Sequence, residues 1–412
     1  MAPGEVFCIV GAGLAGGRAA AALRELGFEG QVVLVGEELD PPYERPPLSK
    51  AFLLGQLPRA RLLLRPAAYY QEHGIELRLG ARALEVQPLE HRLRLQDGSR
   101  LSYDRLLLAT GSTARRLTVP GSDLDGVMTL RTVQESERLQ ALLEVRPRVL
   151  VAGAGFLGCE LAAAARARGC EVRLVEFGPS AMPSMGPQVG EFVARLHRRH
   201  GVELEFQQEV TGFKGGQRVE AAVLADGRTV PCDLALVCVG ATPNSELAQS
   251  AGLEMADGVL VDGNCRSSDP AIFVAGDLAS LWDPGLGRRL RLEHWDSAQR
   301  TGAHAAAAML GTHQPYAPLP YFWSEQYDAM IQQVGLLAPD QQVVVRPGPS
   351  DGSFAAFHMR QGSVVACVAV NRYPELAAAR RLIASRAEVE ASALADPATD
   401  LRHLAAGLER PG

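Results

Sequence analysis

Residues 6–16 read Val-Phe-Cys-Ile-Val-Gly-Ala-Gly-Leu-Ala-Gly, and residues 148–158 read Arg-Val-Leu-Val-Ala-Gly-Ala-Gly-Phe-Leu-Gly. In both stretches an apolar run that is typical of a buried strand leads into a G-x-G-x-x-G pattern. Alanine-rich segments follow, which predict helices over Gly17–Leu26 and Cys159–Arg168. One pattern therefore occurs twice, and it predicts a strand, a glycine-rich turn and a helix each time.

An acidic residue follows the next apolar run in both copies. Gln31–Val35 is followed by Glu37 and Glu38, and Glu171–Val175 is followed by Glu176. Strand, glycine turn, helix, strand and acid form the βαβ fingerprint of dinucleotide binding. Glycine turns that merely join strands to helices would not explain the two acids. The repeat therefore predicts two nucleotide sites in an α/β fold with two Rossmann-like dinucleotide-binding domains.

The glycines have separate physical roles in this fingerprint. The first permits a tight turn, the second lets the backbone approach the pyrophosphate, and the third lets the helix pack close to the strand. The helix N-terminus then offers N–H groups to the anion. The predicted pyrophosphate-binding residues are Gly11, Gly13, Leu14, Ala15 and Gly16 in the first copy and Gly153, Gly155, Phe156, Leu157 and Gly158 in the second.

Composition excludes several classes of protein. The chain has 412 residues, of which 47% are hydrophobic and 21% charged, as in an ordinary globular protein of several domains. A formal net charge of −6 disfavours a general nucleic-acid binder. No apolar run is long enough to span a membrane, and the N-terminus lacks the pattern of a signal peptide. We expect a cytoplasmic protein without a membrane partner.

The seven cysteines form no C-x-x-C pair, which favours reduced thiols and no metal site. Cys8, Cys232, Cys238 and Cys367 lie in or beside apolar runs and are expected in the core. The stretch between Gly36 and Gly80 contains no cysteine. Without a thiolate beside the first nucleotide site there is no dithiol relay.

The rest of the chain alternates strands and turns, and its character changes near Pro318. Beyond this point the pattern predicts strands over Gln342–Arg346, Phe354–Met359 and Val364–Val370. Helices are predicted over Glu375–Ser385 and Glu388–Ala393. This segment is therefore expected to form a separate C-terminal α+β domain.

Several strings together resemble a known family. They are Gly11–Gly16, P-Y-E-R-P-P-L-S-K at 42–50, Ala109-Thr110-Gly111, Gly153–Gly158, V-G-A-T-P-N at 239–244, I-F-V-A-G-D at 272–277, Glu293-His294-Trp295 and Y-F-W-S-E-Q at 321–326. The sequence resembles the FAD-dependent, NADH-oxidising ferredoxin reductases of bacterial oxygenase and cytochrome P450 systems, over essentially its whole length. This resemblance implies an FAD-binding domain from 1–113 and 245–317, an NADH-binding domain from 114–244, and the C-terminal domain from 318–412.

The resemblance implies that the first site holds FAD. Arg45 and Lys50 lie in a proline-stiffened loop, and Lys50 is expected to reach towards the isoalloxazine. Glu37 is expected to bind the adenosine ribose, with Glu38 as an adjacent competitor. Asp277 binds the ribityl chain in the family, although a carboxylate there could also cap a helix. The other implied FAD residues are Ala109, Thr110, Gly111, Glu293, His294 and Trp295.

The second site is expected to take NADH. A carboxylate at Glu176 pairs with a free ribose 2′-OH but repels a 2′-phosphate, and residues 177–181 contain no arginine. Gly240 is a further implied cofactor residue. In the family a glutamate at the position of Glu160 lies near the nicotinamide. Its alternative role, in the first turn of its helix, is to complement the helix dipole.

Trp323 is implied to come close to the flavin, and Lys50, Glu160 and Trp323 are the predicted catalytic residues. Hydride transfer needs close stacking rather than a general base. The predicted enzyme is an NADH-dependent ferredoxin reductase that takes a hydride onto FAD and passes single electrons to a [2Fe–2S] ferredoxin. That partner would bind transiently and electrostatically to a monomer or weak homodimer.

Two alternatives and two basic clusters stay open. The alternatives are a rubredoxin reductase and an apoptosis-inducing-factor-like, NADH-responsive interaction protein. Arg288-Arg289-Leu290-Arg291 suits either an acidic ferredoxin or the solvated face of a strand. His197-Arg198-Arg199-His200 is predicted to end a helix and is assigned no function.

Overall fold

The computed structural model describes residues 4–283, 286–350 and 352–406, and it divides into two compact units. The first unit contains the described residues up to Pro46, together with Leu57–Thr113 and Ala241–Pro318. The second contains Pro47–Gln56, Ala114–Gly240 and the described residues from Leu319 onward. Each unit is built around its own copy of the glycine-rich pattern.

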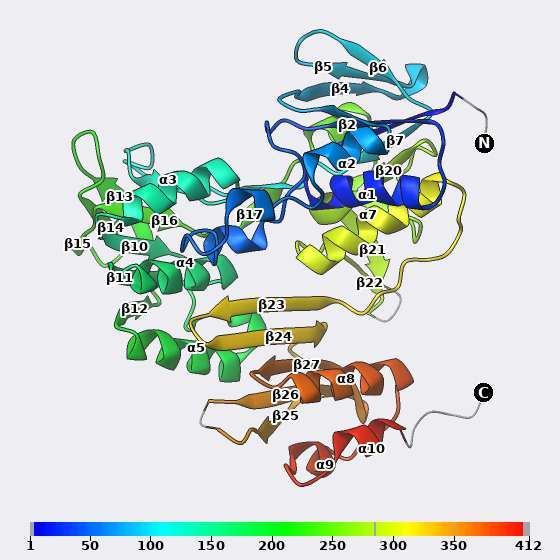
Figure 1. Ribbon diagram of the computed structural model, residues 1–412. Coiled ribbons are helices and arrows are strands. Elements are labelled where there is room, and N and C mark those ends of the chain that lie inside the picture. Colours follow the sequence, from blue (N-terminus) through cyan, green and yellow to red (C-terminus); the bar gives the residue numbers. More distant parts are fainter. Residues whose placement is uncertain (1–3, 284–285, 351, 407–412) are drawn as a thin grey trace. The chain divides into compact units, whose positions relative to one another are not determined.

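A parallel sheet of five strands forms the centre of the first unit (Figure 1). Its order is β20 (Ile272–Val274), β7 (Arg105–Leu108), β1 (Val6–Val10), β2 (Gln31–Val35) and β3 (Ile75–Arg78). Because side chains alternate along a strand, β1 contributes to two cores. Phe7 and Ile9 pack on one face, and Cys8 and Val10 pack on the other.

Helices cover one face of this sheet and a β-meander covers the other. The helices α1 (Leu14–Glu25) and α7 (Trp295–Met309) pack side by side, with Gly302 of α7 directly against the backbone of Ala15. The meander consists of β4 (Ala83–Gln87), β5 (Arg92–Leu95) and β6 (Arg100–Ser102). The remaining elements are α2 (Ala67–Glu72), α6 (Glu246–Ser250), β8 (Ser112–Ala114), β17 (Ala241–Pro243) and a sheet of β18 (Met255–Ala256), β19 (Gly258–Val261), β21 (Ala279–Asp283) and β22 (Arg288–Leu290).

The second unit repeats this arrangement. Its parallel sheet has the order β12 (Val202–Phe206), β11 (Glu171–Glu176), β10 (Arg148–Ala152), β16 (Leu234–Val237) and β9 (Val127–Met128). Its helices are α3 (Val133–Leu143), α4 (Phe156–Ala167) and α5 (Pro187–Arg199). A meander of β13 (Val210–Lys214), β14 (Ala221–Leu224) and β15 (Thr229–Pro231) packs on Leu150, Ala152 and Val175. The predicted pair of Rossmann-like sheets is confirmed.

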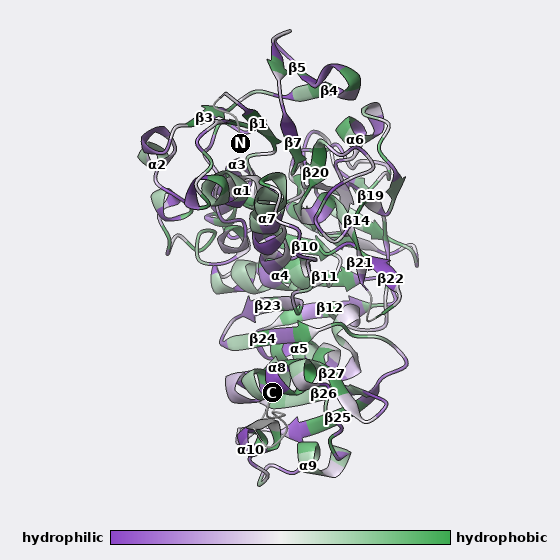
Figure 2. Cartoon of the chain, turned by 90° about the vertical axis from the view of Figure 1, so that its right-hand side faces the viewer, coloured by the Kyte–Doolittle hydropathy of each residue, from purple (hydrophilic) through white to green (hydrophobic). Residues whose placement is uncertain are grey.

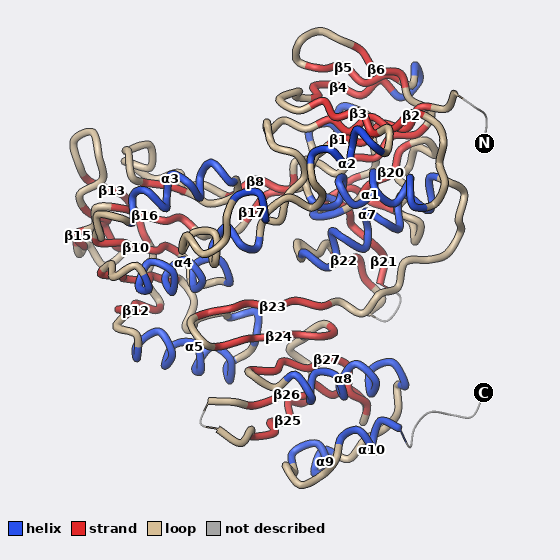
Figure 3. The backbone as a smooth tube through the Cα atoms, in the orientation of Figure 1, coloured by secondary structure: helices blue, strands red, loops and turns tan. Residues whose placement is uncertain are grey.

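An antiparallel sheet follows in the same unit (Figure 3). Its order is β23 (Tyr321–Gln326), β24 (Ala329–Gly335), β27 (Ser363–Val370), β26 (Phe354–Arg360) and β25 (Gln342–Pro347). The helices after it are α8 (Tyr373–Ser385), α9 (Ala391–Ala395) and α10 (Leu401–Ala406). Apolar residues of α8 pack on β24, β26 and β27, and Figure 2 colours β27 largely as hydrophobic. The α+β class of this segment is confirmed.

Three sequence predictions need correction. Both nucleotide-site helices begin three residues earlier than predicted, inside the glycine pattern, at Leu14 and Phe156. The helix predicted over Glu388–Ala393 begins at Ala391, because Glu388 forms a β-bridge with Ser363 and the Val389 N–H donates to the Gly362 carbonyl. The strands β23 and β24 were not predicted.

Candidate functional site

The first glycine loop is shaped by two close backbone approaches. Gly11 has a φ of +111°, and a Cβ atom there would lie 2.1 Å from the Ala109 carbonyl oxygen. A Cβ on Gly16 would lie 1.9 Å from the Gly11 carbonyl oxygen. By contrast, a Cβ on Gly13 would meet nothing within 4 Å. Gly11 and Gly16 are therefore required by the fold, whereas Gly13 borders open space.

The second loop repeats this geometry. Gly153 has a φ of +102°, and a Cβ there would lie 2.5 Å from the Cys238 carbonyl oxygen. A Cβ on Gly158 would lie 1.9 Å from the Gly153 carbonyl oxygen, and one on Gly155 would meet nothing within 4 Å. After the neighbouring strand, Gly240 also has a positive φ of +101°, as Gly111 has in the first copy. The two loops are thus equivalent well beyond the glycine pattern.

Both helices begin at these loops without a side-chain cap. Gly13 is the N-cap of α1 and Gly155 is the N-cap of α4, and in the described structure no side chain bonds to either cap. Neither helix has an acidic residue in its first turn. The uncapped N–H groups, the positive end of the dipole and the open space at the second glycine fit a dinucleotide pyrophosphate. The residues present therefore fit two dinucleotide cofactors.

The acids after the second strands differ between the copies. Glu176 bridges its loop, because its carboxylate accepts hydrogen bonds from the N–H groups of Ala154 at 2.6 Å and Gly178 at 2.7 Å. In the first copy Val35 pairs with Val10 as Val175 pairs with Ala152, so the residue equivalent to Glu176 is Gly36. A Cβ at Gly36 would lie 2.5 Å from the Ala12 side chain. The acids of the first copy therefore stand one and two residues later than in the second.

Glu37 and Glu38 have different surroundings. The Glu37 side chain is 70% exposed and lies 3.7 Å from Arg82. Glu38 accepts hydrogen bonds from the Tyr43 hydroxyl at 2.5 Å and from Arg45 at 2.6 Å. Burial opposes the charge of Arg45, but Tyr43 and Glu38 raise the pKa of its guanidinium overall. The structure thus holds Arg45 in place, and the assignment of the ribose to Glu37 stays a prediction.

The backbone of Thr110 and Gly111 is fixed by Asn244. The Asn244 side-chain amide donates to the Thr110 carbonyl at 2.9 Å, and its backbone N–H donates to the Gly111 carbonyl at 2.9 Å. The Thr110 hydroxyl donates to the Asn244 carbonyl at 2.7 Å. Asn244 stands in the V-G-A-T-P-N string but was not predicted as a site residue.

Asp277 lies in a single 3-10 turn, Gly276–Leu278, between β20 and β21. It is buried and accepts a hydrogen bond from the Ser112 hydroxyl at 2.6 Å. A strand rather than an α-helix follows it, so the alternative role of helix cap is wrong. A buried carboxylate held at the carboxyl edge of the sheet suits the predicted contact with a polar cofactor chain.

The Glu293-His294-Trp295 string starts α7. His294 is its N-cap, and burial, the largest of the influences on it, lowers the pKa of its imidazole. The Trp295 indole N–H donates to Glu44, a contact that sequence reasoning missed. Burial raises the pKa of Glu44, although the Trp295 hydrogen bond opposes that shift. Glu293 accepts a hydrogen bond from Arg291 at 2.5 Å.

Two arginines of the 288–291 cluster serve the fold. Arg291 is 11% exposed and pairs with Asp257 and Glu293. Arg289 donates to the backbone carbonyls of Val261 at 3.0 Å and Ser280 at 2.7 Å. The guanidinium groups of Arg289 and Arg291 are thus bound to partners within the fold. These contacts favour a structural role for the two arginines over a ferredoxin-binding role.

The second unit brings two of the predicted catalytic residues together. The Lys50 ammonium lies 2.7 Å from the Glu160 carboxylate, and their side chains are 15% and 7% exposed. Glu160 also accepts hydrogen bonds from the Ser49 hydroxyl at 2.6 Å and the Ser324 hydroxyl at 2.7 Å. Removing one partner of such a buried pair is strongly destabilising.

The segment that carries Lys50 is anchored to the helices of this unit. Ser136 of α3 donates to the Leu48 carbonyl at 2.8 Å, and Arg168, just after α4, donates to the Leu53 carbonyl at 2.8 Å. Glu160 is the fifth residue of α4, so its predicted place in the first turn is wrong. The ion pair with Lys50, rather than complementarity to the helix dipole, therefore explains the acidic side chain at position 160.

Trp323 lies in β23 of the same unit. Its ring stacks on Tyr321 with centroids 5.9 Å apart, and its indole N–H donates to Glu325 at 3.2 Å. The preceding residue, Phe322, packs on Phe156 at the start of α4, with ring centroids 4.0 Å apart. The F-W-S-E-Q strand thus contacts the second nucleotide loop.

All seven cysteines are free, and all are buried except the half-buried Cys238. Burial raises the pKa of the Cys8, Cys238 and Cys265 thiols to about 12 and that of Cys232 to about 11. It also raises the pKa of Cys159 and Cys367. These side chains stay protonated at neutral pH and are not nucleophiles. The expected core position is confirmed for Cys8, Cys232 and Cys367.

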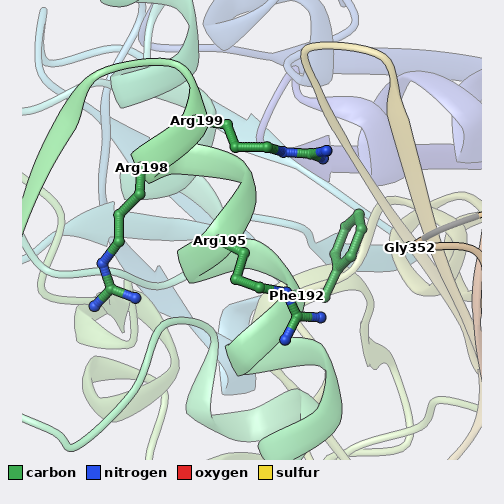
Figure 4. Close-up of a pocket in the computed structure, with 5 residues that line it drawn as sticks. All are labelled: Phe192, Arg195, Arg198, Arg199 and Gly352. Carbon is green, nitrogen blue, oxygen red and sulfur yellow. The ribbon is translucent and has the colours of Figure 1, made fainter.

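A pocket of about 300 Å³ lies beside α5, lined by Phe192, Arg195, Arg198, Arg199 and Gly352 (Figure 4). It contains none of the predicted site residues. In Figure 4 the Arg198 side chain points away from that of Arg199, so the guanidinium groups do not converge. Among the described residues, no cluster of three or more metal-binding side chains occurs. No described helix combines the length and apolarity needed to cross a membrane.

Comparison with known proteins agrees with this geometry. Residues 6–302 match the family of pyridine nucleotide-disulphide oxidoreductases, and residues 321–405 match the reductase C-terminal family. The chain is 41% identical to the anthranilate 1,2-dioxygenase system ferredoxin–NAD(+) reductase component of Burkholderia cepacia over 97% of this chain and 98% of that protein.

Solved structures give the same result. The crystal structure of the ferredoxin reductase for the CYP199A2 system from Rhodopseudomonas palustris is 37% identical, with a TM-score of 0.94 over 97% of this chain and 100% of that one. The covalent putidaredoxin reductase–putidaredoxin complex is 32% identical, with a TM-score of 0.96 over 99% of this chain and 100% of that one. This chain therefore belongs to the pyridine nucleotide-disulphide oxidoreductases, and within them to the FAD- and NAD-dependent ferredoxin reductases of oxygenase and cytochrome P450 systems.

Proposed function

We propose that this chain is an NADH-dependent ferredoxin reductase that accepts a hydride from NADH onto FAD and delivers single electrons to a [2Fe–2S] ferredoxin. The observation that carries the proposal is the pair of equivalent glycine loops in a chain whose cysteines are all free. When bound, FAD supplies the conversion of a two-electron hydride donor into a source of single electrons. Without a reactive thiol, no sulfur relay on this chain competes for those electrons.

The first unit would hold FAD. We propose that the N–H groups of the loop from Gly11 to Gly16 bind its pyrophosphate, and that Asp277 and Arg45 orient its polar chain. Ala109, Thr110 and Gly111 would border it, as would Glu293, His294 and Trp295. Asn244 and Glu44 would fix these residues through the hydrogen bonds described above. The proposed domain division, with FAD on 1–113 and 245–317, NADH on 114–244 and a C-terminal domain from 318, follows these assignments.

The second unit would hold NADH. Gly153, Gly155 and Gly158 would bind its pyrophosphate together with the first residues of α4, and Glu176 would accept hydrogen bonds from the adenosine ribose. We propose that Lys50 and Glu160 lie at the nicotinamide end of this site, because Glu160 lies on α4 two residues after Gly158 of the loop. The Lys50 ammonium would then place a fixed positive charge near the nicotinamide, whose own charge changes during hydride transfer. The approach of Lys50 and Trp323 to the isoalloxazine stays a prediction.

The names of the relatives support a ferredoxin as acceptor rather than a rubredoxin, and they do not favour an apoptosis-inducing-factor-like role. We further propose that the ferredoxin binds transiently and electrostatically, and that the reductase is a monomer or a weak homodimer.

The test is acceptor choice by the purified yellow protein. The NADH-reduced protein is mixed in separate experiments with a [2Fe–2S] ferredoxin, a rubredoxin and O₂, and flavin reoxidation is followed by absorbance. Reoxidation that is fastest with the ferredoxin supports the proposal. Slow reoxidation by every acceptor, together with NADH-dependent dimerisation, would favour the interaction protein instead.

A further inference from the structure

A chain of buried polar side chains runs from Glu160 through the second unit. The Ser324 hydroxyl lies 2.7 Å from Glu160 Oε1, and Gln326 Nε2 lies 3.3 Å from the Ser324 hydroxyl. Gln326 Oε1 lies 3.0 Å from His197 Nε2, and the Tyr327 hydroxyl lies 3.3 Å from His197 Nδ1. Ser324, Gln326 and His197 are each at most 1% exposed. We call these three residues and Tyr327 the Glu160 array.

The chemistry of these groups fixes the direction of every hydrogen bond. An ionised Glu160 is an acceptor only, so the Ser324 hydroxyl donates to it and must itself accept from the Gln326 amide. The Gln326 nitrogen also faces Met182 Sδ at 3.3 Å, which is a further weak acceptor. Gln326 Oε1 then requires a donor, so His197 must be protonated on Nε2. All donors of the array therefore point towards Glu160.

His197 is suited to this role because it carries no charge. Burial, the largest influence, lowers the pKa of its imidazole to about 4. The neighbouring His200 lowers it further, whereas Gln326 opposes the shift. A neutral imidazole with a bare Nδ1 can accept from the Tyr327 hydroxyl, and the Tyr327 ring stacks on His200 with centroids 3.7 Å apart. The array consequently starts beside the exposed His200 and ends at a buried carboxylate.

The array acts on a specific oxygen. Ser49 and Lys50 both donate to Glu160 Oε2, whereas Ser324 donates to Oε1. Removing that donor leaves a buried carboxylate oxygen under-satisfied, which favours rotation of the carboxylate. Rotation would weaken the ion pair that Glu160 makes with Lys50.

We propose that Ser324, Gln326 and His197 are positioning residues that act through Glu160 to hold Lys50 in place for hydride transfer. The inference rests on the proposed function, because it concerns the rate of that step. It adds residues from β23 and α5 that lie outside both glycine loops.

The first test is the tautomer of His197 in the FAD-loaded wild-type protein. Long-range ¹H–¹⁵N correlation spectra of protein labelled with ¹⁵N-histidine report which ring nitrogen carries the proton, and the spectrum of a His197→Gln variant assigns the signal. We expect the proton on Nε2 at neutral pH. A proton on Nδ1, or a doubly protonated ring, would overturn the inference. This result does not depend on turnover, so it is independent of the proposed function.

The second test is rapid mixing of Ser324→Ala with NADH. We expect the rate constant for flavin reduction to fall about tenfold, from the loss of one hydrogen bond to a charged group, with the NADH dissociation constant unchanged. Ser324→Thr keeps the hydroxyl and should restore most of the rate. Ser280→Ala, at another buried strand serine, is the matched control and should behave as wild type.

A wild-type rate in Ser324→Ala, or equal loss in the alanine and threonine variants, would overturn the inference while leaving the proposed function intact. Failure of the wild-type protein to be reduced by NADH would instead refute the proposed function.

Discussion

Substituting Gly155 by alanine separates the folding role of the second loop from its binding role. Gly155 has φ −72° and ψ −169°, which alanine adopts easily, and a Cβ there would meet nothing within 4 Å. A Gly→Ala change at a compatible position gains about 0.4–1 kcal/mol, but alanine is the weaker N-cap by a similar amount. We therefore expect the free energy of unfolding of Gly155→Ala to lie within about 0.5 kcal/mol of the wild-type value.

The same methyl group would occupy the space that fits the pyrophosphate. Losing one hydrogen bond between a backbone N–H and a charged phosphate oxygen costs about 1.5–3 kcal/mol. The dissociation constant of NADH should therefore rise roughly 10- to 100-fold. FAD content should not change, because the first loop is intact. The assays are NADH titration by rapid mixing, the flavin-to-protein absorbance ratio and urea unfolding.

Gly158→Ala is the contrasting variant. A Cβ there would lie 1.9 Å from the Gly153 carbonyl oxygen, so the helix must shift, at a cost of about 1–3 kcal/mol in the free energy of unfolding. A folded Gly155→Ala protein with wild-type NADH affinity would refute the assignment of this loop. A Gly158→Ala protein of wild-type stability would refute the folding role of Gly158.

Three further predictions concern single side chains. Burial lowers the pKa of His197 from 6.5 to about 4. The stability that the neutral imidazole contributes is therefore complete above pH 6.5 and is lost as the pH falls towards 4. Between pH 7 and pH 5 the free energy of unfolding of the wild type, measured with urea, should fall by about 2 kcal/mol more than that of His197→Gln. Equal decreases in the two proteins would contradict this. Arg346 donates to four backbone carbonyls between residues 394 and 399, so Arg346→Met should expose this segment to proteolysis, which wild-type resistance would disprove. Glu176→Ala should raise the NADH dissociation constant at least about tenfold and reduce the preference for NADH over NADPH, both measured by fluorescence titration. An unchanged NADH affinity would refute the ribose contact.

The sequence predicted the local features of the fold well, because each depends on neighbours in the chain. The glycine loops, their flanking strands and the α+β character of the C-terminal segment follow from apolar runs and turn residues. The helix starts at Leu14 and Phe156 were missed because Gly16 and Gly158, taken as turn residues, are the third residues of their helices. Tyr321–Gln326 was interpreted only as a motif, so its strand was overlooked.

Contacts between distant residues could not be predicted in this way. Lys50 and Glu160 are 110 positions apart, and only the folded chain shows that they form an ion pair. The register of β1 with β2 likewise places Gly36, rather than an acid, opposite the first loop. The 197–200 string appeared to be a helix end with cations, yet His197 is buried and neutral. His197 contacts Gln326 at the end of β23, which lies 129 positions further along the chain.

The central claim is that two adenine-dinucleotide sites on this chain bring reducing equivalents from NADH to a flavin without a sulfur intermediary. It is tested most directly by anaerobic mixing of the FAD-loaded protein with one equivalent of either nicotinamide nucleotide. The account predicts full bleaching of the flavin by NADH, much slower bleaching by NADPH, and no change in either rate after alkylation of accessible thiols. A flavin that stays oxidised with NADH, or that is bleached only by a dithiol, would contradict it.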